Sequence, residues 1–188
     1  MNSEFVEAVR QLEREFNMPT GFLGALLHEG DWSFVIKAHA LVEGALSHLL
    51  ASATMDPRLV KIFQRLETSN DVTGKLAFIK AMDLLTPHRR RFIKKLSELR
   101  NQLVHDVNQS SFEFGPYIDS LDSNQRRGFG HTFSWRVRPR DEAPMDDWNE
   151  RAFEAPKQAI WINLLLLLID ASKRRAEYGK FLDEHDIP

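Results

Sequence analysis

Arg100 and His105 are the residues whose types and spacing could do chemistry. With Asn101 they occupy the first, second and last positions of the segment 100–105, near the end of a strongly periodic helical region. An arginine guanidinium stays charged and grips a phosphate with two donors, and a histidine with a pKa of about 6.5 exchanges a proton near neutral pH. Such a pair could cleave an RNA backbone without a metal, so Arg100, Asn101 and His105 are the candidate catalytic residues.

The same spacing occurs a second time, between Arg126 and His131. A chain with seven histidines and many arginines is expected to produce on the order of one or two such matches by chance. The second stretch contains Gly128 and Gly130 and shows no helical period that would fix its side chains. The first pair is preferred because an asparagine directly follows the arginine and the pair lies late in an amphipathic helix.

Length and composition indicate one soluble globular domain. The chain has 188 residues, of which 43% are hydrophobic, enough for one buried core and too few for several. Without any cysteine, disulfides, thiolate chemistry and cysteine-ligated zinc are excluded, and a reducing cytoplasm fits. Residues 1–4 lead directly into a helix pattern, so no secretory segment is expected. The longest apolar run, residues 159–169, is too short to cross a bilayer, so we expect no membrane partner.

Periodicity and capping signals predict an all-α, up-and-down bundle of about five to six helices. Asp31 is expected to cap the central helix, and Thr86 with Pro87 to open the helix that carries the motif. Residues 109–150 lose the helical period and are predicted to be an irregular insertion before the last helix, with a short strand pair around 129–138 as an alternative. The predicted helices cover residues 3–16, 31–53, 56–66, 71 or 73–84, 86–107 and 155–181.

The basic residues at the start of the motif helix need an explanation. The net charge of −2 argues against a surface that attracts nucleic acid everywhere, so any polyanion site must be local. Arg89, Arg90 and Arg91 stand in the first turn, where the helix macrodipole disfavours cations. Either this turn, with Lys94, guides a polyanion toward Arg100, or it forms ion pairs within the protein. The acidic residues considered for those ion pairs are Glu67, Asp71 and Asp83.

The motif helix cannot bring its two candidate residues together by itself. At 100° per residue, Arg100 and His105 lie about 140° apart around the helix axis. A twofold dimer would pool two arginines and two histidines in one cleft, so a homodimer is expected to be part of the mechanism.

His39 and Glu43 form a further pair, one helical turn apart at the edge of the central helix. They are either hydrogen-bonded polar groups at the margin of the core, or Glu43 orients Arg100 or His105 from the neighbouring helix. The remaining histidines lack the spacing of metal ligands. No metal and no cofactor are therefore predicted.

The helical order and the Arg100, Asn101 and His105 motif resemble the HEPN superfamily, in which an Arg-x4-6-His motif lies on a late helix. The segment 31–121 also looks like the mannitol operon repressor-like branch, with Asp31 opening a long helix and Gly74 preceding another. Together these features cover about the first two thirds of the chain.

The resemblance to HEPN ribonucleases implies that this protein is an all-helical homodimer that cuts RNA without a metal. Arg100 would hold the scissile phosphate, His105 would act as general acid or base, and Asn101 would position either of them. The expected product carries a 2′,3′-cyclic phosphate. A toxin or defence component with an antitoxin partner fits this hypothesis. The alternatives are a non-catalytic transcriptional regulator or protein-interaction adaptor, and a helical dimerisation module without a ligand.

Overall fold

The computed structural model describes residues 3–105, 107–133 and 152–184, and these residues are helical and contain no strand. The all-α prediction is confirmed for this part of the chain. The prediction of five to six helices is wrong, because the described residues break into more and shorter segments. The α-helices are α1 (Ser3–Glu15), α2 (Phe22–Ala25), α3 (Asp31–Ala53), α4 (Val60–Phe63), α5 (Lys75–Ala81), α6 (Pro87–Val104), α7 (Phe114–Asp119), α8 (Ser123–Phe133) and α10 (Pro156–Glu184). Short 3₁₀ turns are η1 (Leu26–His28), η2 (Pro57–Leu59) and η3 (Val107–Ser111).

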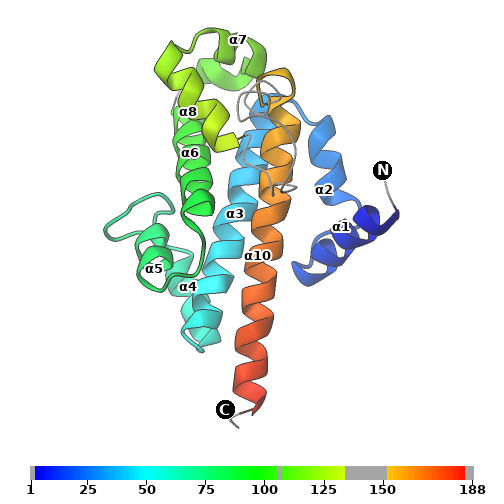
Figure 1. Cartoon of the computed structure of the whole chain (residues 1–188), viewed down its shortest axis with the longest axis vertical. Coiled ribbons are helices and arrows are strands. Elements are labelled where there is room, and N and C mark those ends of the chain that lie inside the picture. The colour runs from blue at the N-terminus through cyan, green and yellow to red at the C-terminus, as the bar shows by residue number, and fades with distance from the viewer. Residues whose placement is uncertain (1–2, 106, 134–151, 185–188) are drawn as a thin grey trace, which may run out of the picture.

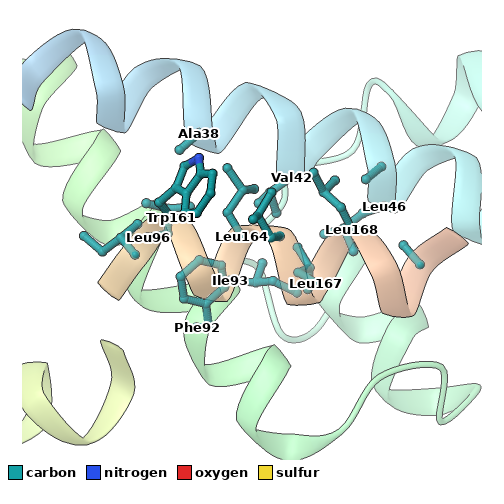
Figure 2. Close-up of a cluster of buried hydrophobic side chains, with 14 of the residues drawn as sticks. Ala38, Val42, Leu46, Phe92, Ile93, Leu96, Trp161, Leu164, Leu167 and Leu168 are labelled. Atoms are coloured by element: carbon teal, nitrogen blue, oxygen red, sulfur yellow. The ribbon is translucent and has the colours of Figure 1, made fainter. Parts of the chain in front are cut away.

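Three long helices form the centre of the protein. Helices α3 and α10 lie side by side and run in the same direction, and α6 packs against them in the opposite direction (Figure 1). Figure 2 shows the shared core, in which Val42 of α3, Ile93 of α6 and Leu164 of α10 are fully buried. This packing fixes the position of α6, and therefore of the motif, relative to α3.

Helix α3 is apolar because it is buried on most of its surface. By length and composition it is the one helix among the described residues that could span a membrane. However, 61% of its apolar 18-residue stretch is buried inside the fold. Asp31 does not cap it, contrary to expectation, because Gly30 occupies that position. The Asp31 carboxylate instead accepts a hydrogen bond from the backbone N–H of Phe114 (2.8 Å) and pairs with Lys157 (2.7 Å), which ties α3 to α7 and α10.

Helix α6 begins as its sequence predicts. Thr86 is the N-cap and its hydroxyl accepts from the backbone N–H of Arg89 at 3.4 Å, with Pro87 in the first turn. At the other end the indole N–H of Trp32 on α3 donates to the carbonyl of Leu103 at 3.3 Å. This bond satisfies one of the carbonyls that a helix C-terminus leaves without a partner.

The segment 109–150 is not irregular over its first half. Helices α7 and α8 lie there, and Phe129 to Phe133, where a strand pair is the alternative prediction, form the last turns of α8. Ring packing holds α8 in place: the centroids of Phe129 and Phe133 are 4.6 Å apart, and Phe133 lies 5.9 Å from Phe92 of α6. The rest of the predicted insertion and strand pair, residues 134–150, lies outside the described residues.

Gly74, which precedes α5, is a position where an added methyl group should destabilise the fold. A Cβ there would lie 2.4 Å from the carbonyl oxygen of Glu67 and 2.8 Å from that of Asn70. Both contacts are with backbone, so Gly74→Ala is expected to lower the free energy of unfolding by about 1–3 kcal/mol, as overpacked positions do.

Urea denaturation measures this cost, and Gly44→Ala is the matched control. Gly44 lies within α3 with open space around the added Cβ, so that change should raise stability by about 0.4–1 kcal/mol. Equal effects of the two changes would contradict the steric explanation.

Candidate functional site

The three motif residues lie at the C-terminal end of α6. Arg100 is half-buried, and its Nη1 donates to Oδ1 of the adjacent Asn101 at 3.0 Å. His105 is exposed at the C-cap, and its backbone N–H donates to the carbonyl of Asn101 at 3.3 Å. Among the described residues, no carboxylate forms an ion pair with Arg100.

Arg100 and His105 leave the helix in different directions. The charge of Arg100 acts on His39 of α3, whereas the exposed His105 lies at the helix end. The angular separation of about 140° places them too far around the axis for one phosphate to reach both easily. The pair can act on one phosphate more readily if a second copy of the chain supplies one of the two groups.

His39 is a buried neutral imidazole at the junction of α3 and α6. Its Nε2 lies 3.1 Å from Oγ of Ser97, and the Ser97 hydroxyl donates to the carbonyl of Ile93 at 2.9 Å. Since that hydroxyl proton is used, we assign the proton of His39 to Nε2, which then donates to Ser97. Burial lowers the pKa of His39, the charges of Arg100 and Lys75 lower it further, and the carboxylate of Glu43 opposes them.

This lowered pKa predicts that the protein loses stability in mild acid. The unfolded chain takes up the His39 proton at a higher pH than the folded protein does. The contribution of His39 is therefore complete above its unfolded pKa of about 6.5 and is lost as the pH falls through the folded pKa. Urea denaturation of wild type at pH 7 and pH 5 should show a larger drop than His39→Gln, in which an amide N–H replaces the donor without titrating. An equal drop in both proteins would contradict the assignment.

One hypothesis from the sequence is that Glu43 orients Arg100 or His105. The side chain of Glu43 contacts other residues instead. Its Oε1 accepts from Nζ of Lys75 and from the hydroxyl of Thr68, both at 3.0 Å. Burial works to raise the pKa of Glu43, but the hydrogen bond and charge of Lys75, with the bond from Thr68, lower it below its ordinary value. Glu43 is thus an anchor for Lys75.

Lys75 is the main residue that sequence reasoning missed. Its side chain is 0% exposed, and Nζ also donates to the carbonyl of Leu66 at 2.9 Å. A usable signal was its position four residues before Ile79, on the buried face of a predicted helix. A fully buried ammonium held by a carboxylate, a hydroxyl and a carbonyl positions α5 against α3.

Most of the basic first turn of α6 is paired within the protein. Arg89 is not a free substrate-binding residue, because it is 3% exposed and its Nε donates to Asp170 of α10 at 2.7 Å. Arg90 donates to the carbonyl of Leu85 at 2.5 Å and lies 3.7 Å from Asp83. The prediction that the first turn of α6 forms ion pairs within the protein is therefore correct for these two arginines. Asp170 is not one of the partners expected from the sequence.

Lys94 and Arg91 differ in what they contact. Lys94 pairs with Asp71 at 2.5 Å, as the pairing interpretation expects. Arg91 is exposed and its Nη1 lies 2.8 Å from Nε2 of His131 on α8. The second Arg-x4-His spacing, Arg126 to His131, lies in this helix, so the expectation that nothing fixes its side chains is wrong for His131.

The described residues include no group of three histidine, aspartate or glutamate side chains that could hold a metal ion. That no metal takes part stays a prediction. Comparison of the chain with protein-family models, with curated proteins and with solved structures gave no match.

Proposed function

We propose that the protein is a metal-independent endoribonuclease of HEPN type that acts as a homodimer. One observation carries the proposal: α6 ends with a half-buried arginine held by its neighbouring asparagine, followed by an exposed histidine at the C-cap. The arginine keeps its charge for a phosphate, and the histidine can exchange a proton with solvent or substrate.

The chemistry is an internal transfer of the phosphate ester. His105 of one copy takes the proton of a ribose 2′-hydroxyl, and the 2′-oxygen forms a bond to phosphorus. The bond from phosphorus to the 5′-oxygen breaks, and that oxygen receives the proton back from the same His105, while the second copy supplies the arginine. Arg100, oriented by Asn101, stabilises the negative charge that develops on the phosphoryl oxygens. The products end in a 2′,3′-cyclic phosphate and a 5′-hydroxyl.

A direct test is incubation of purified protein with single-stranded RNA in excess EDTA. The proposal expects fragments whose 3′ ends carry a cyclic phosphate, detected by mass spectrometry, and a dimer in analytical ultracentrifugation. Intact RNA, or cleavage that EDTA abolishes, would contradict it. A toxin or defence role with an antitoxin partner, and a cytoplasmic location, are proposals that follow only if cleavage is found.

A second candidate is a non-catalytic regulator or adaptor built on the same helices. The ion pairs of Arg89, Arg90 and Lys94 with residues of their own chain favour it, because these cations are then not free to guide an RNA. Under this hypothesis the protein binds a nucleic acid or a protein and leaves RNA intact in the same incubation.

A further inference from the structure

One side of α6 carries a row of polar residues that does not include Arg89, Arg90 or Lys94, whose ion pairs are described above. The row, here called the α6 polar stripe, recurs every three or four residues and so follows one face of the helix. At 1.5 Å per residue it runs about 26 Å along α6. Its members are His88, Arg91, Lys95, Glu98, Gln102 and His105. The candidate catalytic histidine therefore stands at one end of the row.

The opposite end of the stripe is a cluster of cationic and titratable groups. Arg91 meets His131 of α8 at 2.8 Å, and the ring of His88 lies edge-on to that of His131 with centroids 6.4 Å apart. Neither Arg91 nor His131 contacts a carboxylate among the described residues. Burial lowers the pKa of His88, and the charges of Arg91 and His131 lower it further. Arg91 uses one of its five N–H donors on His131, so its other N–H groups can donate to a phosphate placed here.

The middle of the stripe borders a polar hollow between α6, α7 and α8. This hollow has a volume of about 210 Å³ and is lined by Gln102 of α6, Tyr117 of α7 and Gln125 of α8. Amide and phenol groups are the donors and acceptors that read the edges of nucleobases. Those edges are accessible only when the base is unpaired, which favours a single strand over a duplex.

We infer that the α6 polar stripe binds single-stranded RNA, with one backbone phosphate between His88, Arg91 and His131 and an unpaired base in the hollow. The inference rests on the proposed function, because that function makes RNA the expected ligand. A strand that lies along the stripe would also reach His105. Glu98 is the carboxylate of the stripe, and Lys95 partly neutralises it at 3.2 Å. A phosphate backbone should therefore be repelled at Glu98 and attracted at the Arg91 end.

Binding can be measured separately from cleavage with a labelled 2′-O-methyl oligouridine, which lacks the 2′-hydroxyl nucleophile. Fluorescence anisotropy over a salt series is expected to show roughly tenfold weaker binding for Arg91→Gln and a salt slope reduced by about one, the effect of one lost phosphate contact. His131→Gln should weaken binding in the same way. Glu98→Gln should strengthen it severalfold, a gain that a misfolded protein would not show.

Arg65→Gln is the matched control. Arg65 is an exposed arginine two residues after α4, and α4 lies at the other end of the molecule from α8 (Figure 1). The RNA affinity of Arg65→Gln and the salt slope of its binding should equal those of wild type. Unchanged binding in Arg91→Gln, His131→Gln and Glu98→Gln would overturn the inference, as would equal affinity for a duplex. If the variants behave as expected while unmodified RNA stays intact, the stripe is retained and the proposed catalysis is rejected.

Discussion

His105→Ala is expected to lower the rate of RNA cleavage by about 10²–10⁴-fold, the contribution that a positioned general acid or base makes. The histidine is exposed at the end of α6, so its removal leaves no cavity and should not change the thermal unfolding midpoint. Initial rates with a labelled single-stranded RNA in EDTA measure the effect. The matched control is His28→Ala, at an exposed histidine of η1, which should cleave at the wild-type rate.

Arg100→Ala, measured in the same cleavage assay, is also expected to lower the rate. Loss of a group that stabilises charge in the transition state typically costs about 10²–10³-fold in rate. Arg100→Lys keeps the charge but not the planar pair of donors, so it should recover only part of the activity. Rates within a few-fold of wild type in both His105→Ala and Arg100→Ala would remove these residues from the mechanism.

Glu43→Ala is expected to lower the free energy of unfolding by about 3–5 kcal/mol, because it leaves the buried ammonium of Lys75 without its counter-charge. Lys75→Met should cost less. The side chain of Glu43 is 39% exposed, so water can solvate the carboxylate that remains. The two partners of one ion pair should therefore give unequal losses, with the larger loss on the acidic side.

Urea denaturation at pH 7 resolves this difference, and a double variant supplies the control. Glu43→Ala combined with Lys75→Met removes both charges, so it should be more stable than Glu43→Ala alone. If Glu43→Ala costs under about 1 kcal/mol, then the pair does not hold α5 in place, contrary to the geometry described above.

The long helices could be predicted because their signals are local. Thr86 and Pro87 mark the start of α6 through capping chemistry, and long, mostly apolar stretches mark α3 and the first half of α10. Helix α8 could not, because Gly128 and Gly130 disfavour helix locally and ring contacts with α6 hold it instead.

The candidate site was predictable only where its residues are neighbours in the chain. The bond between Arg100 and Asn101 follows from adjacency, and His39 is the core-margin group that one interpretation described. The pairs Lys75 with Glu43 and Arg89 with Asp170 join residues 32 and 81 positions apart. No local pattern encodes such distant pairings, which depend on how the helices pack.

The central claim is that Arg100 of one copy and His105 of a second copy act on the same phosphate, and a mixed dimer tests it most directly. Co-expression of differently tagged Arg100→Ala and His105→Ala chains, followed by two affinity steps, isolates dimers that contain one chain of each kind. Such a dimer keeps one intact pair only if the pair forms across the two chains. We predict cleavage within about tenfold of the wild-type rate, although each variant alone is nearly inactive. Mixed dimers as inactive as the separate variants would contradict the claim.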